Sequence, residues 1–138
     1  MIKLKQKTIV YMKKIIACLL ALFGLTSAYG QKGYEDVDVK EFAELIADSC
    51  VVVLDVRTAE EFAEGHIERA VNIDIKEEGF LTKAKTALST DRMIAVYCRS
   101  GRRSADACDK LSAEGFKVVN LKGGILAWID EKMPVSKE

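Results

Sequence analysis

The sequence predicts one α/β domain with a central, mainly parallel β-sheet flanked by helices on both faces. Strand-like and helix-like segments alternate along residues 31–138, a pattern typical of a parallel sheet whose strands are joined by helices. The run Val51–Leu54 is continuously apolar and mostly β-branched, as expected for a strand buried on both faces. The length of 138 residues suits a single domain of this class.

Capping boxes predict the starts of the first two helices. Asp38 is followed three residues later by Glu41, and Thr58 by Glu61; this spacing lets each side chain cap a backbone N–H of the other residue. After Asp38, apolar residues recur at helical spacing through residue 46, so this helix should bury one stripe. The second helix is expected to end at Gly65.

The remaining elements follow from short apolar runs and glycines. Strands are expected over 70–75, 93–97 and 117–121, a short opening strand is expected to include 35–37, and a weaker helical segment is expected over 77–88. A helix carrying Ala105, Cys108 and Leu111 should end at Gly115, which has the place of a C′ glycine. Gly123 and Gly124 should turn the chain into a closing helix over 125–132.

Residues 1–30 have the layout of a secretory signal peptide, which leaves 31–138 as the mature domain. They hold five lysines and no acidic residue, and an apolar run follows Lys14. That run is shorter than the roughly 20 residues of a membrane span. We therefore expect export, in a bacterium to the periplasm, with no membrane span after cleavage. An uncleaved N-terminal membrane anchor is the alternative.

The charge balance argues against a nucleic-acid partner. The chain has 21 basic and 21 acidic residues, and no Lys/Arg-rich run stands beside aromatic residues. Beyond residue 30 the balance is acidic, with 16 basic and 21 acidic residues. The mature domain therefore has no electrostatic signature of nucleic-acid binding.

The segment most informative about function is Cys98-Arg99-Ser100-Gly101-Arg102-Arg103-Ser104, between a predicted strand and a helix. Ligands of open α/β sheets bind at the carboxyl ends of strands, and a helix N-terminus favours anions. Cations and a helix N-terminus also favour the reactive thiolate of a cysteine. The segment therefore predicts a nucleophilic cysteine beside an anion site.

The other side chains of this loop suit an anionic ligand. Gly101 lets successive backbone N–H groups converge, and the two serine hydroxyls can donate hydrogen bonds. Three arginines in one loop repel one another, so something anionic should lie among them. The alternative is a buried structural cysteine followed by an exposed basic turn.

Together with two further blocks, this loop resembles the single-domain rhodanese family of thiosulfate-type sulfurtransferases. The resemblance covers residues 36–132. Leu54–Ile73 is similar to the family's first signature, Cys98–Ser104 to its active-site loop, and Leu121–Trp128 to its closing segment. One departure is Arg69, where the family usually has glycine, and we expect only a local backbone difference there.

The resemblance implies a rhodanese-like fold and a persulfide mechanism. Cys98 would take the outer sulfur of a small anionic donor such as thiosulfate and pass it to a thiol or cyanide acceptor. The loop N–H groups from Arg99 to Ser104 would cradle that sulfur. Arg102 and Arg103 would hold the donor's anionic end, and Arg99 would either share this role or face outward. No cofactor or metal is implied, and an exported thiol would call for a redox protein partner.

Two other functions stay open. One is a persulfide-carrying or protein-binding rhodanese module without substantial turnover. The other is phosphatase or arsenate-reductase chemistry on the same fold, for which the usual loop is Cys-x5-Arg. Here the residue six positions after Cys98 is Ser104, and Arg103 falls one position short. The shorter loop favours a cradle for a single sulfur atom.

Three charged residues follow the buried strand. Asp55 and Arg57 are possible borders of the pocket, and Glu61 lies four residues after Arg57. We expect Arg57 to pair with Glu61 and hold the turn. Asp55 is left open between a pocket border and a structural role.

Three further residues receive structural interpretations. His66 is the only histidine, which argues against a metal site because such a site needs further ligands. The resemblance implies that His66 lies in a structural turn. Cys108 and Trp128 are expected in the core. A Cys50–Cys108 or Cys98–Cys108 disulfide stays open, since geometry decides disulfides.

Overall fold

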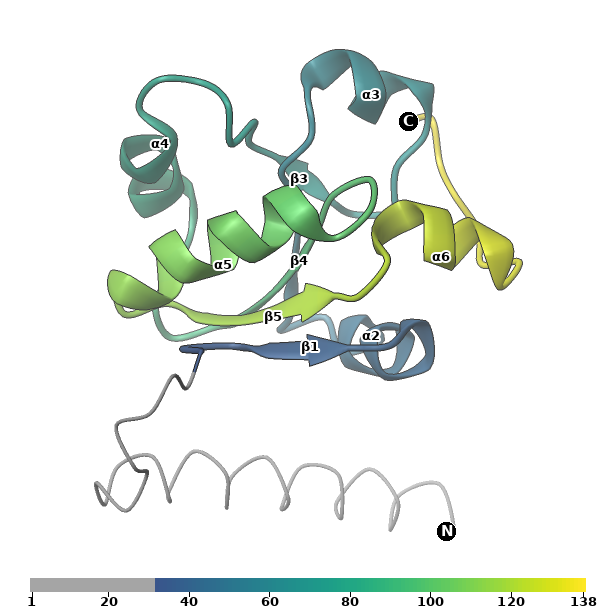
Figure 1. Cartoon of the computed structure of the whole chain (residues 1–138), viewed down its shortest axis with the longest axis horizontal. Coiled ribbons are helices and arrows are strands. Elements are labelled where there is room, and N and C mark those ends of the chain that lie inside the picture. The colour runs from purple at the N-terminus through teal and green to yellow at the C-terminus, as the bar shows by residue number, and fades with distance from the viewer. Residues whose placement is uncertain (1–31) are drawn as a thin grey trace, which may run out of the picture. The chain divides into compact units, whose positions relative to one another are not determined.

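The computed structural model describes residues 32–138 as a single layer of sheet between helices (Figure 1). Every neighbouring pair of its strands is parallel. The strand order is β1-β5-β4-β2-β3. The strands are β1 (Glu35–Val37), β2 (Val52–Asp55), β3 (Val71–Asn72), β4 (Met93–Tyr97) and β5 (Lys117–Leu121). The predicted α/β class with a central parallel sheet is confirmed.

Within residues 32–138, five helices accompany the sheet, and four of them build two separate cores. The helices are α2 (Val39–Ile46), α3 (Ala59–Glu64), α4 (Phe80–Ala87), α5 (Arg102–Ala113) and α6 (Gly124–Asp130). Helices α4 and α5 pack with Leu54 in one core, and α2 and α6 pack with Val53 in the other. Because successive strand residues point to opposite faces, the two cores lie on opposite sides of the sheet.

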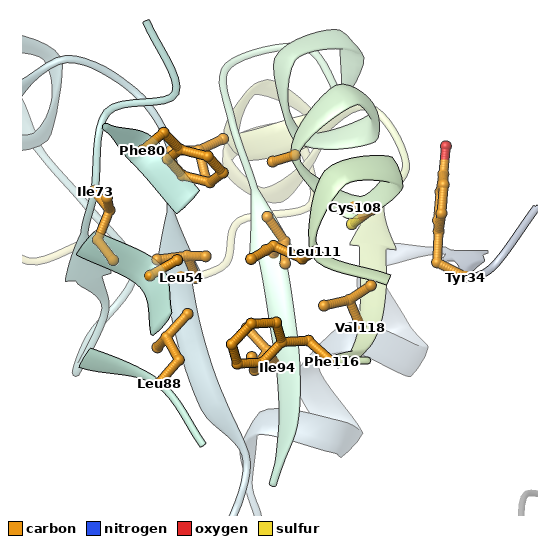
Figure 2. Packing of buried hydrophobic residues seen from close by; sticks show 14 of the residues in the cluster. Tyr34, Leu54, Ile73, Phe80, Leu88, Ile94, Cys108, Leu111, Phe116 and Val118 are labelled. Atoms are coloured by element: carbon orange, nitrogen blue, oxygen red, sulfur yellow. The ribbon is translucent and has the colours of Figure 1, made fainter. Parts of the chain in front are cut away.

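Figure 2 shows the core that contains α4 and α5. Phe80 of α4 and Leu111 of α5 lie over Leu54 and Ile94 of the central strands. These four side chains are buried. This core fixes the start of α5, and with it the loop that carries Cys98.

The helix boundaries follow the predicted local signals. The Asp38 side chain accepts a hydrogen bond from the Glu41 backbone at 2.8 Å, and Thr58 and Glu61 form a reciprocal capping box. After α5, Gly115 has φ +89°. The Gly115 N–H bonds Ser112 O, and the next N–H bonds Leu111 O, which is a Schellman ending.

Three predicted elements are shorter than expected. The strand predicted over 70–75 is only Val71–Asn72, at the sheet edge beside β2, and the chain beyond it bonds β2 and Val56 through the N–H groups of Ile73 and Ile75. The helix predicted over 77–88 begins at Phe80, after Gly79 with φ +80°. The closing helix ends at Asp130 rather than 132, since Lys132 adopts φ +62°.

The predicted signal peptide lies outside the described residues. Within residues 32–138, no helix combines the length and apolarity that crossing a bilayer would require.

Candidate active site

Cys98 directly follows β4, at the carboxyl end of a central strand, and only 1% of it is exposed. Its Sγ accepts hydrogen bonds from the Gly101 backbone N–H at 3.1 Å and from the Ser104 hydroxyl at 3.3 Å. Ser104 is fully buried in the first turns of α5. Two donors aimed at one sulfur atom stabilise negative charge on it.

The loop curls tightly around Cys98 because of Gly101. This residue is the N-cap of α5 and has φ +100°, a conformation that favours glycine. A Cβ there would also lie 3.2 Å from the Gly123 nitrogen. The turn therefore aims the N-terminus of the 12-residue helix α5 at the sulfur, where its dipole favours an anion.

The closing segment holds the other side of the loop through backbone contacts. Ile125 N–H donates to Cys98 O at 2.9 Å, and Leu126 N–H donates to Arg99 O at 3.2 Å. A Cβ on Gly124 would lie 2.4 Å from Arg99 O and 2.7 Å from Cys98 O. The N-terminus of α6 thus binds the loop carbonyls, and only glycine fits at 124.

Asn120 also supports the loop and was not anticipated from the sequence. Its amide donates to Gly101 O at 3.4 Å and to the Asp36 carboxylate at 2.9 Å. This bond lowers the pKa of Asp36 below its ordinary value. Asn120 is a buried residue in strand β5, and the signal that could have identified it is a polar amide that interrupts an apolar run.

The three loop arginines have different surroundings. Arg99 and Arg102 are exposed, whereas Arg103 is half-buried. The Arg103 guanidinium binds both carboxylate oxygens of Glu61, at 2.7 and 2.8 Å. This hydrogen bonding lowers the pKa of Glu61 to about 2. Glu61 therefore supplies an anion that relieves the repulsion among the arginines.

The predicted pairing of Arg57 with Glu61 is wrong. Arg57 instead folds back on Asp55, with Nη2 2.7 Å from Oδ2, and also donates to Gly65 O at 2.7 Å. Asp55 is fully buried, and a buried carboxylate requires such a partner. The Arg57 guanidinium lies over the Tyr97 ring, 5.7 Å from its centroid.

A groove of about 270 Å³ lies beside the loop, between α3 and α6. We call it the α3–α6 groove. Its lining residues are Arg57, Glu61, Glu64, Gly65, Arg99, Ile125, Leu126, Ile129 and Val135. Of the two possible border residues, Arg57 therefore lines the groove and Asp55 does not. Figure 1 shows the C-terminal segment running back from α6 toward α3 on this side.

His66 and Trp128, for which structural roles are predicted, are both buried and hydrogen-bonded to backbone carbonyls. His66 is buried, with Nε2 2.7 Å from Glu138 O and Nδ1 3.0 Å from Phe62 O. Trp128 is buried in the core and donates to Pro134 O at 2.8 Å. Arg69 adopts φ +67°, a conformation that favours glycine, and its guanidinium donates to Ile46 O at the end of α2. The expectation of only a local backbone difference is therefore wrong, because this side chain links two elements.

The cysteines at 50, 98 and 108 are free thiols. Cys108 is buried in the core as predicted, and burial raises the pKa of its thiol. Cys50 is exposed. Neither of the disulfides left open by the sequence forms. Among residues 32–138, no cluster of three or more His, Cys, Asp or Glu side chains could hold a metal ion.

Known proteins resemble this chain over nearly all of the described domain. Residues 38–131 match the rhodanese-like domain. A sulfurtransferase of Allochromatium vinosum is 33% identical over 102 residues, which cover 72% of this chain and 92% of the relative. Thiosulfate sulfurtransferase 18 of Arabidopsis thaliana is 40% identical over 114 residues, which cover 74% and 83% of the two chains.

The fold also matches solved structures. The crystal structure of a rhodanese-related protein from Thermoplasma volcanium superposes with a TM-score of 0.68 at 37% sequence identity. The match covers 76% of this chain and all of that one.

Proposed function

The chain belongs to the rhodanese-like domain family, and on this premise we propose that it is a thiosulfate-type sulfurtransferase. Cys98 would accept the outer sulfur of thiosulfate, or of a similar small anionic donor, as a persulfide. A thiol or cyanide acceptor would then remove that sulfur. The observation that carries the proposal is the convergence of the Gly101 N–H and the Ser104 hydroxyl on Cys98 Sγ.

Two displacements at sulfur complete the reaction. The Cys98 thiolate attacks the outer sulfur of thiosulfate; a new S–S bond forms, and the old one breaks with its electron pair leaving on sulfite. The acceptor then attacks the outer sulfur of the persulfide, and the Sγ–S bond breaks to regenerate the thiolate. The transfer consumes neither oxidant nor reductant. Donors aimed at Sγ stabilise the thiolate both as nucleophile and as leaving group.

The loop arginines would hold the donor. Arg99 and Arg102 are exposed and available to a small anion. Arg103 would contribute to the extent that the donor competes with Glu61 for its guanidinium. Loop N–H groups from Arg99 to Ser104 would surround the transferred sulfur.

A sulfur-transfer assay tests the proposal. The full chain should form thiocyanate from thiosulfate and cyanide, and Cys98→Ser should form none. Cys50→Ser is the matched control, because Cys50 is exposed and lies outside the loop, and it should keep wild-type turnover. A phosphate ester should not be hydrolysed in a parallel assay; hydrolysis dependent on Cys98 would contradict the assignment. A persulfide that forms without turnover would identify a sulfur carrier instead.

We further propose that residues 1–30 direct export and that a redox protein keeps Cys98 reduced. The lysine-rich start and apolar run support export, and exported thiols face an oxidising compartment. Fractionation of a bacterial host expressing the full chain should recover a soluble periplasmic form that begins at Gln31. A full-length form in the membrane fraction would indicate the anchored alternative.

A further inference from the structure

The α3–α6 groove carries an aliphatic surface that an inorganic sulfur donor does not need. Leu126, Ile129 and Val135 line it and are 43%, 48% and 46% exposed. In residues 32–138, the one other large hydrophobic side chain exposed to this degree is Val71, at 40%. Exposed apolar side chains that gather in one place mark a binding surface.

The aliphatic wall is joined directly to the active-site loop. The backbone N–H groups of Ile125 and Leu126 donate to the carbonyls of Cys98 and Arg99. Arg99 itself lines the groove and follows Cys98 in the chain. Cys98 itself does not line the groove, but a molecule there contacts Arg99, the next residue along the active-site loop.

The size and charge of the groove favour a small organic molecule with an uncharged body. Its volume of about 270 Å³ is close to the roughly 300 Å³ of the smallest small-molecule sites. Nine residues line it, whereas a stable protein interface involves roughly 20–30 residues on each side. Four of its lining residues are charged: Arg57 is paired with Asp55 and Glu61 with Arg103, which leaves the exposed residues Glu64 and Arg99. Arg99, which is exposed, lies at the end of the groove next to the active-site loop. Its positive charge favours the thiolate form of a thiol that enters the groove.

Resting on the proposed sulfur transfer, we infer that this groove binds the sulfur acceptor and that the acceptor is an aliphatic thiol. Its carbon chain packs on Leu126, Ile129 and Val135, and its sulfur faces the Cys98 persulfide. The thiolate attacks the outer sulfur and forms a new S–S bond. The Sγ–S bond breaks with its electron pair returning to Cys98, and the persulfide proton stays on the transferred sulfur. The product is an alkyl persulfide, formed without oxidant or reductant.

A single-turnover experiment tests this inference. The full chain is loaded with thiosulfate, freed of donor, and discharged by a short thiol, 2-mercaptoethanol, or a long one, 6-mercaptohexan-1-ol. At equal subsaturating concentrations the long thiol should discharge the persulfide about 10-fold faster, because its additional methylenes are partly buried. Cyanide, which has no carbon chain to bury, gives the reference rate for each variant.

Variants of the wall should remove this preference. Leu126→Ser/Ile129→Ser should reduce the ratio of long-thiol to short-thiol rates to about twofold. Val135→Ser, outside any helix, should lower the same ratio with no effect on α6. Val71→Ser is the matched control, an equally exposed apolar residue outside the groove, and should keep the wild-type ratio. An unchanged ratio in both wall variants would overturn the inference.

A binding measurement separates this inference from the proposed function. Hexan-1-ol, an unreactive probe, should shift the methyl resonances of Leu126 and Ile129 in the unloaded protein, and not that of Val71. If thiosulfate does not load Cys98, the proposed function is wrong, but the hexan-1-ol shifts still show whether the groove binds an aliphatic chain. Loading and cyanide discharge without such shifts would overturn the groove assignment alone.

Discussion

Arg103 and Glu61 join the active-site loop to helix α3 through a bidentate ion pair, with N–O distances of 2.7 and 2.8 Å. Glu61 also completes the capping box that begins α3. One carboxylate therefore fixes the start of a helix and occupies an arginine beside Cys98. The positive charge that the loop offers to a donor is smaller than its three arginines suggest.

Substitutions of Glu61 and of Arg103 should change kcat/KM for thiosulfate in opposite directions. Glu61→Gln should free Arg103 and raise kcat/KM for thiosulfate about threefold, while Arg103→Ala should lower it about 10-fold, because a charge-assisted bond to the donor is lost. Steady-state kinetics at low and high salt measure both, and the gain in Glu61→Gln should shrink with salt. A loss in both variants would show that the pair only braces the loop.

The same ion pair predicts a pH-dependent contribution to stability. Arginine lowers the pKa of Glu61 from 4.5 to about 2 in the folded state. A depressed folded pKa stabilises the fold above the unfolded value, and this stabilisation is lost as pH falls from 4.5 toward 2. Glu61→Gln, which can keep the bond to Thr58, should cost about 1 kcal/mol at neutral pH.

Urea unfolding of wild type and Glu61→Gln across this pH range measures the effect. The difference in unfolding free energy should narrow as pH falls below 4.5 and vanish only once pH is well below 2. A difference that stays constant with pH would assign the cost to packing rather than to charge.

Removing one donor to the sulfur should slow the chemistry of Cys98. In a Cys50→Ser background, Ser104→Ala should reduce the rate of alkylation by iodoacetamide at neutral pH about 10-fold, since hydrogen bonds to charged groups contribute about 1.5–3 kcal/mol. Ser100→Ala is the control, because Ser100 is an exposed residue of the same loop. Equal alkylation rates in Ser104→Ala and Ser100→Ala would show that the Ser104 hydroxyl does not stabilise the Cys98 thiolate.

A methyl group at Gly124 should disrupt the loop from the opposite side. Gly124→Ala would place Cβ against the carbonyls of Arg99 and Cys98, so we expect at least a 10-fold loss of transfer and a cost above about 2 kcal/mol. Gly79→Ala has a similar positive φ but no atom within 4 Å of the added Cβ. It should cost about 1 kcal/mol and keep activity. Comparable losses of transfer in both variants would contradict the clamp by α6.

Features set by neighbouring residues could be predicted from the sequence. The Thr58 box and the glycine ending at Gly115 depend on spacings within one turn, and both form as expected. The strands over 93–97 and 117–121 form with the predicted bounds, since the first is an apolar run and three of the five residues of the second are apolar. The short opening strand also forms, over Glu35–Val37, although Val37 is its one apolar residue. The position of Cys98 between a strand and the N-terminus of a helix could be predicted in the same way, because the strand, the loop and the helix are consecutive in the sequence.

Contacts between distant segments could not be predicted. The four-residue spacing of Arg57 and Glu61 suggests an ion pair. In the fold, Arg57 pairs with the buried carboxylate of Asp55 instead. Glu61 pairs with Arg103, which lies 42 positions away in the sequence. Asn120 reaches Gly101 from a neighbouring strand. The groove also depends on Val135, which folding brings near Gly65. Apart from the pair of Arg57 with Asp55, each of these contacts joins residues that are far apart in the sequence, so no local sequence pattern predicts it.

Mass spectrometry of the full chain after thiosulfate treatment tests the central claim most directly. Reduced wild-type protein and the Cys50→Ser control should each gain the mass of one sulfur atom on Cys98, and cyanide should remove it. Cys98→Ser should gain nothing. No gain in reduced wild-type protein, or an equal gain in Cys98→Ser, would contradict the assignment of Cys98 as the sulfur-carrying nucleophile.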